Sequence, residues 1–88
     1  MVWTVKFDPR AFAELQKLDR PAQRRITTYL LERIAGESDP RKFGKALTGE
    51  TAGLWRYRIG DYRVVCSIND LPHTVSVLRV AHRKDVYR

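Results

Sequence analysis

The sequence predicts a single α+β domain, residues 1–88, in which a helical hairpin packs on one face of a small antiparallel-type sheet. Three observations support this class. A chain of 88 residues has room for one modest core and no second domain. Apolar residues alternate at the start of the chain and again after residue 53, as in strands. Two stretches with helical spacing lie between these regions, so the predicted order is βααβββ.

The first strand and the first helix follow directly from local signals. Residues 2–7 alternate with Trp3, Val5 and Phe7 on one side, which is typical of a half-buried strand. Asp8 then suits a helix N-cap, and Pro9 suits the first helical position, where its missing N–H costs nothing. The apolar stripe of this helix is predicted to consist of Phe12, Leu15 and Leu18.

A second helix is predicted from Pro21 to a stop at Gly36. Its apolar residues recur at helical spacing: Ala22, Ile26, Tyr29, Leu30 and Ile34. Residues 36–52 are predicted to form a loop, because glycine and proline interrupt any period there. Leu47 is the expected anchor of this loop to the core.

Three strands are predicted after Gly53, over residues 54–59, 62–68 and 74–82. The loop between the last two, residues 69–73, would leave His73 in solvent. Residue parity does not fix which face Val75 and Val77 occupy, and we expect them to be available to a partner protein.

Gly60-Asp61 fixes the register of the first hairpin, because glycine at the first loop position is what a two-residue type II′ turn requires. Arg58 then lies opposite Arg63. Alternation sorts the side chains into two faces. The face expected to pack under the helices carries Trp55, Tyr57, Ile59, Tyr62, Val64 and Cys66, and the other face carries Arg56, Arg58 and Arg63.

The charge of the chain points to a polyanionic partner. Seventeen Lys and Arg against ten Asp and Glu give a net charge of +7, and the pI is near 10.1. Such surfaces most often bind nucleic acid. Two opposed arginines with no nearby carboxylate repel each other, which favours an anion site over a merely soluble sheet face. The remaining expected nucleic-acid contacts are Arg41, Lys42, Lys45, Lys84 and Arg88.

The C-terminal stretch adds three candidates. Arg83 lies where it can join the arginine face. His82 has an unperturbed pKa near neutrality and is a possible acid or base, although alternation points it away from Arg83. Tyr87 is either a fraying tail residue or a platform for an unstacked RNA base. A single cysteine excludes an internal disulfide and a cysteine-based metal site. The sequence also shows no cluster of carboxylates or of His and Cys that would hold a metal, and no cofactor is expected.

No apolar run approaches the ~18 residues that would span a membrane. The start of the chain does not resemble a signal peptide, and a cytoplasmic location is therefore expected.

Two segments of the chain resemble the RelE family of toxins from toxin–antitoxin modules: Gly53-Leu54-Trp55-Arg56-Tyr57-Arg58-Ile59-Gly60-Asp61-Tyr62-Arg63-Val64-Val65 and Val80-Ala81-His82-Arg83-Lys84-Asp85-Val86-Tyr87. The resemblance implies the RelE-like microbial RNase fold. It also implies a metal-independent, ribosome-dependent endonuclease that cuts mRNA in the ribosomal A site and is neutralised by a cognate RelB-like antitoxin in a hetero-oligomer. The expected partners are thus the antitoxin, the small ribosomal subunit and mRNA, with no membrane.

The resemblance also assigns site residues. The two basic positions before the glycine turn fall on Arg56 and Arg58, the arginine after it on Arg63, the arginine after the last strand on Arg83, and the C-terminal tyrosine on Tyr87. In well-known members the first two positions are lysines, one of them the base, whereas a guanidinium is a poor proton acceptor. The base is therefore open between His82, Tyr87 and an RNA group. Two alternatives remain: a ParE-like DNA gyrase inhibitor without nuclease activity, and a catalytically silent RNA- or protein-binding module.

Overall fold

The computed structural model describes residues 3–36 and 39–84. The helical elements are α1 (Pro9–Gln16), α2 (Arg20–Tyr29), the π-helical η1 (Leu30–Ala35) and two 3-10 turns, η2 (Pro40–Lys42) and η3 (Gly49–Thr51). The strands are β1 (Thr4–Phe7), β2 (Lys45–Ala46), β3 (Trp55–Ile59), β4 (Tyr62–Asp70) and β5 (His73–His82).

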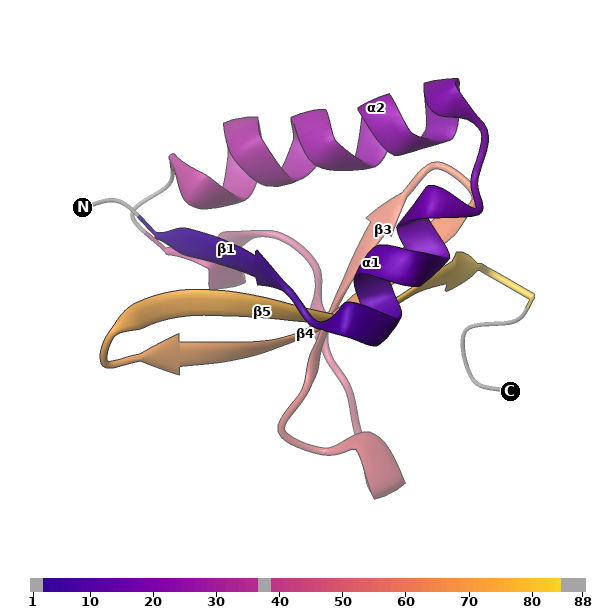
Figure 1. Ribbon diagram of the computed structural model, residues 1–88. Helices are drawn as coiled ribbons and strands as arrows, with labels where there is room; N and C mark the ends of the chain where they lie inside the picture. Colours follow the sequence, from indigo (N-terminus) through magenta and orange to yellow (C-terminus); the bar gives the residue numbers. More distant parts are fainter. Residues whose placement is uncertain (1–2, 37–38, 85–88) are drawn as a thin grey trace.

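The predicted α+β class is confirmed. The strands form one sheet in the order β1-β5-β4-β3-β2, and α1 and α2 lie on the same side of it (Figure 1). The sheet is mixed, because β1 runs parallel to β5 while the other neighbours are antiparallel. Parallel neighbours need a long connection, and here the helices and strands β2 to β4 all lie between β1 and β5 in the chain.

The first helix begins at Pro9 as predicted, and the second begins at Arg20, one residue before the predicted Pro21. The Asp8 carboxylate accepts the Arg10 N–H, and the Asp19 carboxylate accepts the Ala22 N–H at 2.9 Å, with a proline in each first turn. α2 continues directly into η1, and this helical segment ends at its C-cap, Gly36, as predicted. The predicted stripe of α1 was partly wrong: Ala11 and Leu15 are buried, whereas Phe12 is 50% exposed and meets Phe7 only edge-on.

The core lies between the helices and the sheet. It contains Trp3 and residues from both helical segments and from β3, β4 and β5, including Ile26, Ile34, Tyr57 and Val64. Val75 and Val77, which we expected to be available to a partner, are fully buried in this core. The expectation was wrong because β1 pairs with β5 at these residues and places them under the helices.

Two loop predictions also needed correction. Residues 36–52 are not irregular throughout, because Lys45 and Ala46 pair with Arg56 and Trp55 as the edge strand β2. The β4–β5 loop is shorter than predicted, with His73 already in β5. Its ring stacks on Trp3 at 4.4 Å and is half-buried, since the turn is short enough to bring it back over β1.

A β-bulge divides β5. Val65 pairs with Arg79 and the next residue, Cys66, pairs with Val77, which leaves Leu78 without a partner. The bulge reverses the parity of β5, so Val75 and Val77 face the core before it and Val80 faces the core after it. The buried residues therefore shift from odd to even positions.

Glu14 of α1 supplies the hydrogen-bond acceptor that the free edge of β5 lacks at this bulge. β1 ends opposite Val77, and beyond that point the Glu14 carboxylate accepts the Val80 N–H at 2.8 Å and the Arg79 Nε–H at 3.0 Å. One side chain thus replaces a missing strand partner and also pairs with an arginine.

Replacing Glu14 by Ala is expected to destabilise the protein by about 1–3 kcal/mol, the cost of leaving a largely buried donor unsatisfied. Glu14→Gln keeps an acceptor for the Val80 N–H and is expected to lose less. Chemical denaturation of both variants and the parent chain measures the difference. Equal stability of Glu14→Ala and the parent would contradict this role.

Candidate functional site

The β3–β4 hairpin adopts the predicted register. Arg58 pairs with Arg63, Tyr57 with Val64, and Ile59 with Tyr62. Gly60 has φ +60°, and among the described residues every residue with positive φ is a glycine, so Asp61 has negative φ. This combination fits the type II′ turn predicted from Gly60-Asp61. The turn therefore fixes which residues share a face.

Arginines from adjacent strands gather on the face opposite the helices. Cross-strand pairing gives two rows, one with Arg56, Val65 and Arg79, the other with Arg58, Arg63 and Ala81. Because directly paired residues point to the same side, this surface carries four arginines together with Val65 and Ala81. Val65 is buried although it lies outside the main core.

Arg63 differs from its neighbours because it is only 9% exposed. Its Nη1 donates to the carbonyl oxygens of Tyr62 at 3.1 Å and Gly60 at 3.4 Å. These contacts hold the guanidinium at the turn, away from the exposed Arg58 side chain. Arg58 is exposed and Arg56 is half-buried.

Arg83 lies beside the same turn. Its backbone N–H donates to the Asp61 carbonyl at 2.8 Å, which continues the β4–β5 ladder past the end of β5. The structure thus brings four of the predicted residues together at one end of the sheet: Arg56, Arg58, Arg63 and Arg83. Sequence reasoning missed that Arg79 joins this face, where its guanidinium pairs with Glu14, although the shift of apolar positions in Val75, Val77 and Val80 was a signal of the bulge that turns it there.

His82 is not grouped with the arginines. It pairs with Tyr62 on the helix-facing side, and the two rings meet edge-on at 5.8 Å. Its Nδ1 accepts the Lys84 N–H at 3.3 Å, so Lys84 closes a turn after β5. Tyr87 and Arg88 lie outside the described residues.

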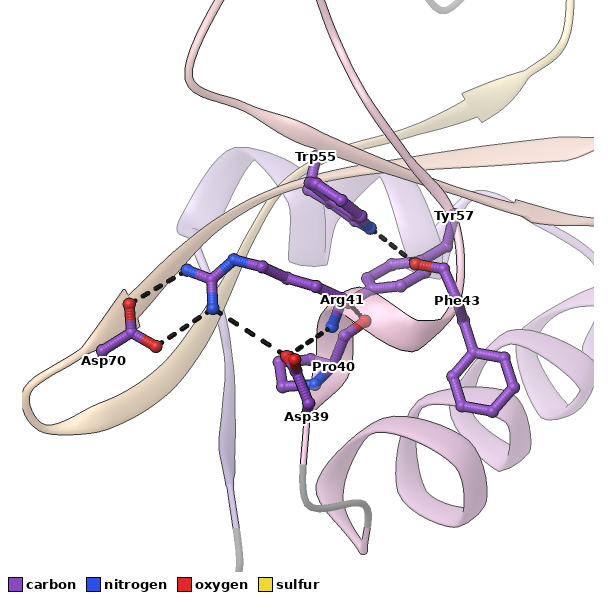
Figure 2. Close-up of polar contacts among 7 residues, drawn as sticks. All are labelled: Asp39, Pro40, Arg41, Phe43, Trp55, Tyr57 and Asp70. Carbon is purple, nitrogen blue, oxygen red and sulfur yellow. Dashed lines mark hydrogen bonds and ion pairs between the residues drawn. The ribbon is translucent and has the colours of Figure 1, made fainter.

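Arg41 ties the loop before β2 to the β4–β5 hairpin. Figure 2 shows its guanidinium in a two-pronged pair with Asp70, at 3.0 and 3.1 Å, with Asp39 on its other side. A contact between Arg41 and RNA would therefore compete with an intramolecular ion pair. Lys42 and Lys45 are exposed on the same loop and on β2.

Two aromatic side chains of β3 anchor this loop to the sheet. Trp55 Nε1 donates to the Phe43 carbonyl at 2.6 Å, and the Tyr57 hydroxyl donates to the Pro40 carbonyl at 2.8 Å (Figure 2). Burial raises the pKa of Tyr57, so its hydroxyl remains a neutral donor. Burial likewise raises the pKa of Cys66 to about 12, which keeps that thiol protonated in the core.

The Arg41–Asp70 pair predicts an acid-dependent contribution to stability. The hydrogen bond from Arg41 lowers the pKa of Asp70. The contribution is thus complete above the usual aspartate pKa of about 3.9 and is lost as the pH falls through the lowered value. We expect Asp70→Asn to melt slightly below the parent chain at pH 7, and the two melting temperatures to converge as the pH falls through the lowered pKa of Asp70. Asp61→Asn, at a carboxylate without an ion pair in the described part of the chain, is the control and should show no such convergence.

Within residues 3–36 and 39–84, no three His, Cys, Asp or Glu side chains cluster so as to hold a metal ion. No helix in these ranges is long and apolar enough to cross a membrane.

Residues 5–87 match a protein family described as the ParE toxin of the type II toxin–antitoxin system parDE. Toxin RelG of Mycobacterium tuberculosis is 39% identical over 90 aligned residues, which span 100% of this chain and 99% of that toxin. Toxin RelE of the same organism is 35% identical over 80 residues, covering 89% of this chain and 78% of that toxin.

Two solved structures extend this similarity to the fold. The toxin–antitoxin complex RelBE2 from Mycobacterium tuberculosis contains a chain with a TM-score of 0.86 and 34% identity, covering 94% of this chain and 100% of that chain. The archaeal RelE–RelB complex from Pyrococcus horikoshii OT3 contains one with a TM-score of 0.67 and 27% identity, covering 98% and 100%.

Proposed function

This chain belongs to the RelE/ParE family of toxins of type II toxin–antitoxin systems, and from that membership we propose that it is a ribosome-dependent mRNA endonuclease. It cuts mRNA in the ribosomal A site and so inhibits translation in the cytoplasm. The observation that carries the proposal is the set of arginines at one end of the sheet: Arg56, Arg58, Arg63 and Arg83. A rigid surface of guanidinium groups is suited to a phosphodiester.

The proposed reaction is attack of a ribose 2′-OH on the neighbouring phosphate. The 2′-oxygen gives its proton to a base and bonds to phosphorus. The bond from phosphorus to the 5′-oxygen then breaks, and that oxygen takes a proton to leave as a 5′-OH. Negative charge builds up on the phosphate oxygens, and each well-placed donor stabilises it by about 2.7–4 kcal/mol. Arg56, Arg58, Arg63 and Arg83 have this role.

The base is not one of these arginines, because a guanidinium remains protonated at neutral pH. His82 lies on the other face of the sheet, which leaves Tyr87 and an RNA group of the ribosome as the better candidates. The proposal therefore assigns charge stabilisation to this chain's arginines and keeps the proton acceptor open between those two.

A cognate RelB-like antitoxin is the proposed second partner. Solved relatives are RelBE2 and RelE–RelB complexes, in which a toxin is bound to its antitoxin. By analogy, an antitoxin segment covers the arginine surface of this chain and neutralises it.

A gyrase inhibitor is the second candidate, because the family that matches residues 5–87 is described by its ParE member. In well-known nucleases of the family a lysine at one of the positions of Arg56 and Arg58 serves as the base. This chain has arginine at both positions and so lacks that base. In this case the same surface would bind a protein and cleave nothing.

Primer extension on a defined mRNA separates these functions. Ribosomes are stalled with an empty A site and incubated with the purified chain, free of antitoxin. Cuts confined to the A-site codon, and absent without ribosomes, are expected. A folded chain that makes no cut but blocks DNA supercoiling by gyrase would overturn the nuclease proposal in favour of the second candidate. A chain that binds RNA and does neither is the silent module.

A further inference from the structure

A groove runs along the edge of β3 that β2 leaves uncovered. It is made of two hollows that meet at Tyr29 and Arg58. One hollow lies between α2 and the β3–β4 turn, with Arg25 and Arg33 on its helical side. The other continues towards β2 and includes Lys45 and Arg56. The groove therefore begins at the arginine surface of the candidate site and leads away from it along α2 and η1.

The groove is strongly basic. Five cationic side chains line it, Arg25, Arg33, Lys45, Arg56 and Arg58, against one carboxylate, that of Glu32. None of the four arginines forms an ion pair with a carboxylate in the described part of the chain. Their positive charge is therefore not cancelled within the molecule and is available to an anion.

Neighbouring groups hold these cations in place. The Arg33 guanidinium lies 5.4 Å from the centre of the Tyr29 ring and 6.0 Å from that of Phe43. Arg25 lies against Gly60, where an added Cβ would come within 2.7 Å of its Nη1. Arg56 Nε is buried and has no hydrogen-bond partner. Such positioning lowers the entropy lost when the cations bind a ligand.

We propose that this groove binds the backbone of single-stranded RNA beyond the nucleotide that is cut. The inference rests on the proposed function and extends it, because it assigns Arg25 and Arg33 to substrate binding away from the reacting phosphate. An RNA strand whose phosphate lies on the arginine surface continues into the groove without crossing another element, since Arg56 and Arg58 belong to both the surface and the groove.

The lining favours RNA over an acidic protein segment. A peptide that binds in a groove normally places apolar side chains in pockets. Here the lining is mostly charged or polar, and Ile59 is 3% exposed. Evenly spaced phosphates fit a row of cations, and Tyr29 provides a half-buried ring beside them.

The test is binding of a labelled 2′-O-methyl oligoribonucleotide, which cannot undergo 2′-OH attack, to the full chain. Arg25→Gln/Arg33→Gln is compared with Lys6→Gln/Lys17→Gln, which removes the same charge from β1 and from the end of α1, away from the groove. We expect the groove variant to bind at least tenfold more weakly at physiological salt. Its plot of log affinity against log salt should be shallower by about 1.4, two lost phosphate contacts at about 0.7 each.

Cleavage of mRNA by this chain on stalled ribosomes provides the second readout. The groove variant should need more protein for half-maximal cleavage and should keep the single-turnover rate at saturation. Equal binding by the groove and control variants, or no binding by the parent chain, overturns the inference. An unchanged RNA affinity together with lost gyrase or antitoxin binding would assign the groove to a protein instead. Failure of the parent chain to cut mRNA contradicts the proposed function and is scored independently of these binding results.

Discussion

Replacing Arg63 and Arg83 together by alanine is expected to abolish growth inhibition and to lower A-site cleavage by about 10³-fold or more, because a single well-placed donor to a developing oxyanion contributes about 10²–10³. The two residues come from β4 and from the turn after β5, and the Asp61 carbonyl holds Arg83 next to the hairpin. Their losses need not add, since donors to one phosphate act as a unit. Growth assays and single-turnover cleavage measure the effect.

The control for this experiment follows from the burial of Arg63. Its guanidinium donates to two carbonyl oxygens at the turn, so its removal also weakens the hairpin. Thermal melting of the double variant must therefore show that the domain is folded. Arg58→Ala/Arg83→Ala removes two exposed arginines and serves as the version without that structural cost. Arg10→Ala/Arg24→Ala removes two exposed helical arginines and should stay toxic. Toxicity retained in a well-expressed Arg63/Arg83 double variant would rule out the assigned site.

Gly44→Ala is expected to destabilise the protein by about 2–4 kcal/mol, combining left-handed backbone strain with overpacking. Gly44 has φ +75°, and a Cβ there would lie 2.3 Å from the Arg56 carbonyl and 2.7 Å from Trp55 Nε1. The backbone must then move away from β3, which breaks the Trp55–Phe43 hydrogen bond and opens the end of the groove at Lys45. Chemical denaturation measures the loss.

Gly49→Ala is the matched control for this prediction. Gly49 has φ +67°, close to that of Gly44, but an added Cβ there meets nothing within 4 Å. It should therefore show the backbone strain alone, about 1–2 kcal/mol. If the two variants lose the same free energy of unfolding, the close approach of Gly44 to β3 does not contribute to stability and the prediction is wrong.

Much of the candidate site was predictable because it lies on one hairpin. A two-residue turn at Gly60-Asp61 leaves no freedom in register, so the Arg58–Arg63 pairing followed from the sequence alone. What alternation could not show was the different environment of the two partners. Arg63 is buried at the turn and Arg58 is exposed, a difference that depends on contacts with carbonyl oxygens and on the place of β4 between β3 and β5 in the sheet.

The groove and the Arg41–Asp70 pair were beyond sequence reasoning for a different reason. Arg25 and Arg33 belong to a helical segment and Arg58 to a strand, and only packing of that segment over β3 brings them together. Arg41 and Asp70 are 29 residues apart and meet because the loop before β2 folds back over the β4–β5 hairpin. In the sequence these charged residues are far apart, and no pattern indicates that they meet.

The sequence by itself determined the helix start at Asp8, the β3–β4 register and the face that carries Arg56, since each depends on neighbours within a few residues. The tertiary structure alone decided the parallel pairing of β1 with β5, the pairing of β2 with β3 at the sheet edge, and the Glu14 carboxylate at the β5 bulge. Those features satisfy backbone groups and bury apolar surface between segments that are distant in the chain. Their free energy exists only once the helices and the sheet have packed together.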